Sequence, residues 1–210
     1  LVKNYFAGVQ QCLDEGMTKL ETLALELLAD PRDITLNLES LTLLTSLSVK
    51  MPHRHPAHSL TLSVMPELQV LRFEGQTPRH PENWLALLPQ LTRLERLQWT
   101  EMSSNDRLHI SSHLPVTTCL TILTLHPYHQ VEDANKALYA ALPNMPGLTR
   151  VDHVLNAVDS ADWLDWLAKS SLTEIPSAMW QSNQWDVLPQ MTALRRLTLS
   201  DGPPTQAFYK

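Results

Sequence analysis

Cysteine and glycine are scarce in this chain of 210 residues. Its two cysteines, Cys12 and Cys119, are too few for a disulfide framework, and no Asn-x-Ser/Thr glycosylation site occurs. We therefore expect a reducing compartment. The five glycines form neither a Gly-x-Gly-x-x-Gly motif nor a P-loop, which excludes the usual phosphate-binding loops of nucleotide-dependent enzymes.

Long apolar runs and clusters of basic residues are also missing. No stretch approaches the roughly 20 consecutive apolar residues of a membrane span, so we expect no transmembrane segment and no membrane partner. The 16 Lys and Arg are spread along the chain and the formal net charge is −6, which argues against nucleic acid as a partner. What the chain has instead is 43% apolar residues, enough for a continuous core.

A pattern of leucine, two variable residues, an apolar residue, one variable residue and a second apolar residue recurs throughout the chain. Its clearest copies lie in LPQLTRLERLQW, from Leu88 to Trp99, and in LPQMTALRRLTL, from Leu188 to Leu199. Alignment gives eight units whose first residues are separated by 24, 24, 26, 26, 28, 24 and 22 positions. The units begin at Leu20, Leu44, Leu68, Leu94, Leu120, Leu148, Leu172 and Leu194.

Each unit predicts a short strand, and most predict a helix before it. The step from Leu97 to Trp99 has the period of a strand with one buried face. Upstream, apolar residues at helical spacing predict helices around Trp84–Leu88, Ala137–Leu142, Trp163–Leu167 and Trp185–Leu188. One unit is too small to be stable alone, so the units must stack, with parallel strands side by side, helices outside and leucines between them. The predicted fold class is α/β.

These units resemble the leucine-rich repeat family, whose repeats of about 20 to 29 residues carry L-x-x-L-x-L-x-x-N/C-x-L. The resemblance covers Leu20 to Asp201. It implies a horseshoe solenoid of about eight repeats, with a parallel sheet on the concave face and helices on the convex face. The family's Asn position departs from the motif, since Gln76, Met102, Tyr128 and Gly202 stand there and Asn156 alone fits.

The length of the units and the absence of cysteine-rich caps look like the ribonuclease-inhibitor-like, F-box-associated or bacterial effector subclasses. These imply an intracellular protein, or one secreted into a host cytosol. We expect a single domain, with an N-terminal helix or partial repeat over 1–16, repeats over 17–201 and a tail over 202–210. A start at Leu1 without Met, and a thin final cap, suggest a fragment of a longer protein.

Two units are expected to be irregular. Pro176 stands at a strand position in the unit of Leu172, where it removes one donor from the ladder, and Ser177 replaces an apolar residue. We expect a distorted strand there. In the unit of Leu148, His153 takes an inward position, which predicts a buried neutral imidazole with a hydrogen-bond partner.

The resemblance implies a non-catalytic module that binds a protein partner through the concave sheet face or the rim loops. Residues between the buried ones should face the concave wall, where arginine is often prominent at binding hot spots. The predicted partner contacts are Arg72, Glu74, Arg96, Gln98, Thr100, Thr124, His126, Arg150, Asp152 and Arg196. A solvated sheet face that binds nothing is an equal interpretation. The alternative function is the substrate-recognition part of a ubiquitin ligase or F-box-type adaptor whose remaining domains lie outside this chain.

No catalytic, cofactor or metal site is predicted, and we expect no enzyme activity of this chain. The histidines of MPHRHPAH, 51–58, and of HPYHQ, 126–130, lack nearby cysteines, and solvated loops or rim contacts are favoured. Cys12-Leu13-Asp14 is similar to the Cys-x-Asp of bacterial ubiquitin ligases with leucine-rich repeats, but it is interpreted as helix packing. The stretch MWQSNQW, 179–185, is also interpreted as packing rather than as a ligand-stacking cage.

Overall fold

Each of the eight repeat units forms one strand, which begins two residues after its leading leucine. The structure, a computed structural model, describes residues 17–26, 34–36, 38–51, 60–75, 82–102, 104–114, 117–127, 132–153, 161–178 and 187–199. The eight strands are β1 (Thr22–Glu26), β3 (Ser46–Lys50), β5 (Val70–Glu74), β6 (Arg96–Met102), β7 (Ile122–Pro127), β8 (Arg150–His153), β9 (Glu174–Ala178) and β10 (Arg196–Leu199). The predicted position of every strand is confirmed.

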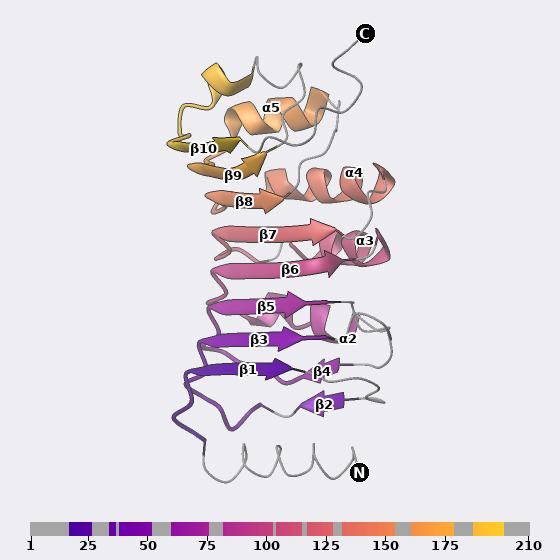
Figure 1. The fold of residues 1–210 in the computed structure, drawn as a ribbon, viewed down its shortest axis with the longest axis vertical. Coiled ribbons are helices and arrows are strands. Elements are labelled where there is room, and N and C mark those ends of the chain that lie inside the picture. The colour runs from indigo at the N-terminus through magenta and orange to yellow at the C-terminus, as the bar shows by residue number, and fades with distance from the viewer. Residues whose placement is uncertain are drawn as a thin grey trace.

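These strands form a single parallel sheet in which they lie in chain order, from β1 at one edge to β10 at the other (Figure 1). The register follows the repeat, so that Leu47 of β3 pairs with Leu23 of β1 and with Leu71 of β5. Equivalent positions of successive units therefore form continuous columns across the sheet.

A second ladder of hydrogen bonds runs along the edge where the strands begin. The carbonyl oxygen of Glu21 accepts the backbone N–H groups of both Thr45 (2.9 Å) and Ser46 (3.0 Å), and the Thr45 hydroxyl donates to the same oxygen (3.0 Å). The same pair of backbone hydrogen bonds recurs down the array at the carbonyls of residues 45, 69, 95, 121, 149 and 173. Each unit is thus tied to the next before its strand begins.

Within a unit, buried residues also continue upstream of the strand. In the fourth unit, Leu88, Leu91, Leu94 and Leu97 follow one another at three-residue steps, and none is more than 4% exposed. The N–H of Leu91 donates to the carbonyl of Leu88 (3.2 Å), and that of Leu94 to the carbonyl of Leu91 (3.0 Å), so the first two steps are tight turns. Two other units contain an equivalent series of buried residues. One is Leu38, Leu41, Leu44 and Leu47, and the other is Leu142, Met145, Leu148 and Val151. Each of these units therefore buries two apolar residues that precede its leading leucine and lie outside the repeated pattern.

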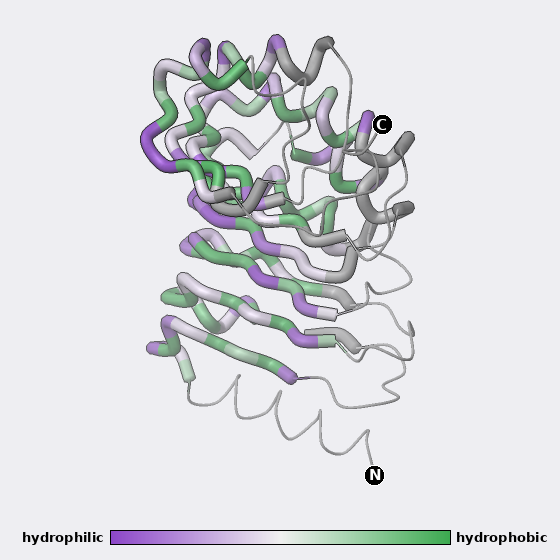
Figure 2. Tube along the Cα trace, turned by 45° about the horizontal axis from the view of Figure 1, so that its top comes forward, coloured by the Kyte–Doolittle hydropathy of each residue, from purple (hydrophilic) through white to green (hydrophobic). Residues whose placement is uncertain are grey.

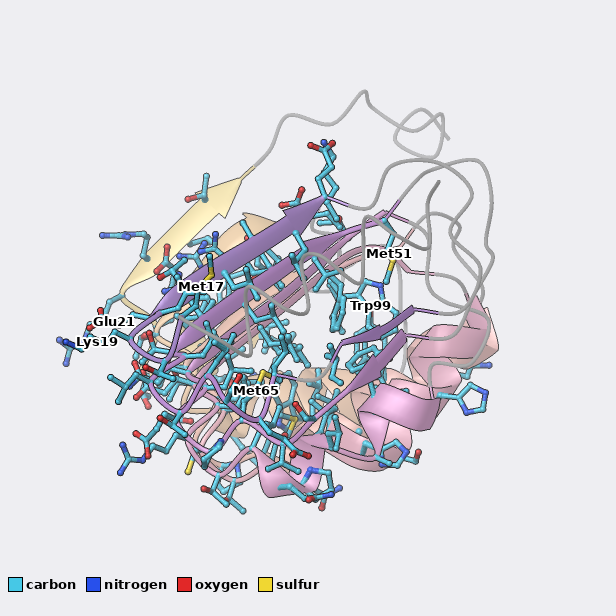
Figure 3. The ribbon with its side chains drawn as sticks, turned by 90° about the horizontal axis from the view of Figure 1, so that it is seen from below. Met17, Lys19, Glu21, Met51, Met65 and Trp99 are labelled. Atoms are coloured by element: carbon cyan, nitrogen blue, oxygen red, sulfur yellow. The ribbon has the colours of Figure 1, made fainter. Side chains whose placement is uncertain are left out.

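A second layer closes the other side of the core, and its structure changes along the array. Its helices are α2 (Glu82–Leu85), α3 (Ser104–His113), α4 (Glu132–Ala141) and α5 (Ala161–Lys169). Helix α2 contacts α3, and α3 packs against α4. Seen down the stack, Met65 and Trp99 lie between this layer and the main sheet, whereas Lys19 and Glu21 lie at the edge where the strands begin (Figure 3). The α/β class is confirmed.

The expectation of helices throughout this layer is wrong for the first units. There the chain forms β2 (Ile34–Leu36) and β4 (Leu60–Leu62), which pair in parallel as a separate two-stranded sheet. Their sequences, ITL and LTL, are short and centred on β-branched threonine, which favours a strand over a helix. Strand β4 contacts α2, so the small sheet and the helices form one layer.

The helix predictions are otherwise confirmed in part. Helices α4 and α5 lie where the apolar spacing predicts them. The helix expected around Trp84–Leu88 is instead the four-residue α2, which ends at Leu85 and is followed by a 3-10 turn, η1 (Leu88–Gln90). From Leu85 on, the buried residues Leu85, Leu88 and Leu91 recur at every third position. Helix α3 was not predicted, because SNDRLHISSH carries two apolar residues and no such stripe.

An aromatic cluster fills the core behind the middle of the sheet. The ring of Trp84, from α2, lies 4.3 Å from that of Phe73 in β5 and 4.8 Å from that of Trp99 in β6, measured between centroids. All three side chains are 1–2% exposed. These tilted contacts link the second layer to two neighbouring strands.

The irregular strand predicted in the seventh unit is confirmed. Glu174 and Ile175 of β9 pair with Arg196 and Leu197 of β10, but Ala178 pairs with Leu199, so β9 contains one extra residue. On the other side, the ladder between β8 and β9 contains the single pair Arg150 and Glu174. The bulge follows from Pro176, which has no N–H to donate.

Several predicted features lie outside the described residues. They are the N-terminal segment 1–16 with Cys12, the histidine-rich residues 52–58, the loop 128–130, Asn156, the stretch 179–185 and the segment 202–210. The side chain of His153 also lies outside the described residues. Across the ranges that the structure describes, each helix is too short or too polar to cross a membrane.

Gly75 ends β5 in a conformation that other residues rarely adopt. Its φ is +90°, and a Cβ at this position would overlap the backbone carbonyl of Met51. Met51 is held there because its N–H donates to the carbonyl of Glu74 at 2.6 Å.

Replacing Gly75 by alanine is expected to lower the free energy of unfolding by about 1–3 kcal/mol or more, because the change combines backbone strain with this overlap. Urea denaturation followed by tryptophan fluorescence measures the effect. Gly147→Ala is the matched control, since its Cβ would lie 3.3 Å from the carbonyl oxygen of Thr118 and a small shift relieves that contact. Equal losses in the two variants would contradict this role of Gly75.

Candidate partner-binding face

The residues that alternate with the buried ones form the face of the sheet opposite the core, called here the non-core face. Figure 2 shows the alternation of polar and apolar residues along the strands. By register, its first column contains Thr22, Ser46, Val70, Arg96, Ile122, Arg150, Glu174 and Arg196. Its second contains Ala24, Ser48, Arg72, Gln98, Thr124 and Asp152, and its third Glu26, Lys50, Glu74, Thr100 and His126.

All ten predicted contact residues therefore occupy positions of one face. Their side chains are not equally exposed to solvent. Thr124 is 8% exposed, and the Thr100 hydroxyl points back to the carbonyl of Phe73 at 3.5 Å. The side chain of His126 lies outside the described residues. The charged residues and Gln98 are the predicted contacts that remain available to a partner.

At the C-terminal end of the face, the charges are paired with one another. Arg150 places Nη1 3.4 Å from Oε1 of Glu174 and Nη2 3.5 Å from Oδ2 of Asp152. Nη1 of Arg196 lies 3.3 Å from the same Oε1 of Glu174. Two arginines and two carboxylates thus neutralise each other across three strands.

Glu174 is the residue of this cluster that the sequence-based prediction missed. It occupies the first column between Arg150 and Arg196, and its side chain is 20% exposed. The repeat pattern could have identified Glu174 as a residue of this face, because it stands two residues after Leu172 and the same position in the flanking units holds the two arginines. The irregular seventh unit was left out of the predicted face, and the carboxylate between the arginines was overlooked with it.

The N-terminal end of the face is also paired. Nζ of Lys50 lies 2.6 Å from Oε1 of Glu26, and Glu74 pairs in register with Lys50 on its other side. The hydrogen bond and charge of Glu26, with a smaller contribution from Glu74, raise the pKa of Lys50 above its ordinary value. Lys50 is therefore bonded to Glu26 and also lies in the field of the Glu74 carboxylate.

Between these ends, Arg72 and Arg96 occupy neighbouring strands without a partner. In the part of the chain that the structure describes, neither side chain forms an ion pair or a hydrogen bond, and Nε of Arg72 is buried without an acceptor. A buried donor left unsatisfied costs about 1–3 kcal/mol. Nε of Arg150 is unsatisfied as well, but both of its terminal nitrogens face carboxylates.

The cross-strand neighbours of the two central arginines carry no charge. Arg96 lies between Val70 and Ile122 in the first column, and Arg72 lies between Ser48 and Gln98 in the second. The next carboxylate along β5, Glu74, pairs in register with Lys50. The centre of the face is consequently cationic, although the chain as a whole is acidic.

Among the described residues, no three His, Cys, Asp or Glu side chains gather as a metal site requires. Cys119 is an exposed free thiol in the turn before β7.

Comparison with protein-family models finds none that matches the chain, and comparison with curated proteins finds no match.

Removing the shared carboxylate in Glu174→Gln is expected to lower the free energy of unfolding by less than about 1 kcal/mol, because its partners Arg150 and Arg196 are 33% and 71% exposed. The measurement is a double-mutant cycle with Arg150→Gln in urea denaturation. Glu26→Gln is the control, with a smaller expected loss, since Glu26 and Lys50 are 57% and 46% exposed. Additive losses of Glu174→Gln and Arg150→Gln would mean that the pair does not couple.

The raised pKa of Lys50 predicts a titration that depends on Glu26. Because the folded-state pKa lies above the unfolded value, the pair stabilises the fold below about pH 10.4 and loses that contribution as pH rises through the folded pKa. NMR titration of Lys50 measures this value. Glu26→Gln should return it toward the ordinary value, and Glu74→Gln should move it less. An unchanged pKa in Glu26→Gln would refute the assignment.

Proposed function

We propose that this chain is a leucine-rich repeat solenoid that binds a protein partner through its non-core face and catalyses no reaction. The repeat lengths, the strand in every unit and the continuous leucine columns support this architecture. In it, the array curves as a horseshoe with the non-core face concave. The low cysteine content supports a cytosolic location, in its own cell or in a host.

The size of the face supports a macromolecular partner. Eight strands at a spacing of roughly 4.8 Å extend about 34 Å, and five-residue strands are roughly 17 Å long. The resulting flat area is about 580 Å², which is about seven-tenths of the roughly 800 Å² that each partner contributes to a standard protein interface. A small molecule would occupy a fraction of this surface.

The observation that carries the proposal is the pair of unpartnered arginines, Arg72 and Arg96, at the middle of the face. Lys50, Arg150 and Arg196 on either side form ion pairs within the chain, whereas the side chains of Arg72 and Arg96 have no partner among the described residues and are free to bind another molecule. Arginine is enriched at binding hot spots, which tend to lie near the centre of an interface.

The experiment is a pull-down with the whole chain beside a face variant and a matched control. The face variant is Arg72→Glu with Arg96→Glu. The control is Arg93→Glu with Lys169→Glu, which makes the same change of net charge at exposed residues of a turn and of α5. All three proteins are first shown to unfold at similar urea concentrations.

A protein that the parent and the control retain, and that the face variant loses by about tenfold or more, is the expected result. Retention by all three chains would place binding elsewhere on the molecule. If the parent itself retains no protein, the proposed function is wrong for this chain. Recovery of ubiquitin-pathway subunits would favour a substrate-recognition role within a ligase.

A further inference from the structure

We propose that the centre of the non-core face binds an extended acidic segment of the protein partner, in which two carboxylates at alternate positions contact Arg72 and Arg96. The inference rests on the proposed function and specifies the chemistry of its partner. It follows from the spacing of the two arginines, from their uncharged neighbours and from the paired charges on either side.

The two arginines are placed for two ligands rather than one. In register, Arg72 pairs with Gln98, and Arg96 precedes Gln98 by two residues on the same face of β6. At about 4.8 Å between strands and 3.3 Å per residue, their Cα atoms lie about 8 Å apart. Side chains at alternate positions of an extended peptide point to one side and are separated by about 7 Å. A segment with the pattern acidic-x-acidic therefore presents two carboxylates at a matching interval.

The surroundings strengthen this contact. Val70 and Ile122 flank Arg96 and supply no competing acceptor side chain. Apolar neighbours lower the local dielectric constant, and a carboxylate bound there interacts more strongly with a guanidinium than it does in open solvent. Carboxylates also match the planar guanidinium fork, with which they form paired hydrogen bonds.

The paired charges at the two ends of the face confine the acidic segment to the centre. Toward β1, Lys50 forms an ion pair with Glu26, and Glu74 of β5 lies beside Lys50 in register, so these three residues carry a net charge of −1. Toward β10, Arg150 and Arg196 are balanced by Asp152 and Glu174. An acidic segment displaced toward β1 meets repulsion, and one displaced toward β10 gains no free cation. The charge pattern thus selects the position as well as the sign of the ligand.

A phosphate backbone fits this site poorly. Binding to nucleic acid depends on several cations that each neutralise a phosphate, whereas this face offers two, on a chain with a net charge of −6. Carboxylates of a protein segment need no larger basic surface. Phosphate is nonetheless the competing ligand that the experiment must include.

The test is an NMR titration of the full 210-residue chain that follows the arginine Nε–Hε signals. The probe is a short capped peptide with two glutamates separated by one valine, beside the same peptide with both glutamates replaced by glutamine. Single variants, Arg72→Gln and Arg96→Gln, assign the two signals. The glutamate peptide is expected to shift both, and the glutamine peptide to shift neither.

Two double variants then distinguish binding at the two arginines from a general effect of net charge. Arg72→Gln with Arg96→Gln is expected to weaken peptide binding by about tenfold or more. Lys50→Gln with Arg196→Gln makes the same change of charge on the same face, at residues that already have partners, and is expected to weaken binding by less than about twofold. Arg72→Lys with Arg96→Lys retains both charges without the planar fork and should bind between these limits. Tryptophan fluorescence confirms that each variant keeps the parent core.

Three results would overturn the inference. The first is equal weakening in the two double variants, which would reduce the effect to net charge. The second is a phosphate titration that shifts both signals and displaces the peptide at equal concentration. The third is a partner protein that needs Arg72 and Arg96 in the pull-down while the glutamate peptide shifts neither signal. In that case the proposed binding function stands and its acidic-segment chemistry fails.

Discussion

The structure depends on the fact that no repeat unit can bury its own leucines. A unit has one strand and one connecting segment, and its apolar side chains are covered by the units before and after it. The strand leucines show this directly. Leu47, Leu71, Leu97 and Leu123 of inner units are 0–1% exposed, whereas Leu23 and Leu197, in the strands at the two edges of the sheet, are partly buried. Full burial of one leucine stabilises by about 1.5–3 kcal/mol, so the columns supply much of the driving force for stacking.

The same constraint determines the surface. Because the leucines of neighbouring units must align, the polar residues between them align as well, and residues more than twenty positions apart in sequence become neighbours. Lys50 meets Glu26 across 24 positions, and Arg196 meets Glu174 across 22. The ion pair of Arg93 with Glu67, in the turns before β6 and β5, has the same origin. The charge pattern of the non-core face, including the two arginines without partners among the described residues, is therefore a consequence of core packing.

Irregularity is tolerated where other contacts hold the array together. The extra residue of β9 interrupts its pairing with β10, yet the backbone ladder at the start of the strands continues, since the carbonyl of Thr173 accepts the N–H groups of Arg195 (2.9 Å) and Arg196 (3.0 Å). Glu174, which joins the arginines of the flanking strands, adds a second connection at this point. In the second layer, the change from short strands to helices leaves the main sheet regular, because the leucine columns face both kinds of element.

The position of all eight strands, their parallel order, the bulge at Pro176 and the shared face of the ten predicted contacts could be read from the sequence. These features depend on periodicity, and a repeat with a strand spacing of two leaves little choice of register. Tertiary structure alone decided which charges on that face are satisfied. Arg72, Arg96, Arg150 and Arg196 look equivalent in sequence, but two of them lie within reach of Glu174 and two do not. It also decided that ITL and LTL become strands of a second sheet and that Thr124 is covered. Such outcomes depend on the distances between side chains of different units, and those distances exist only once the units have stacked.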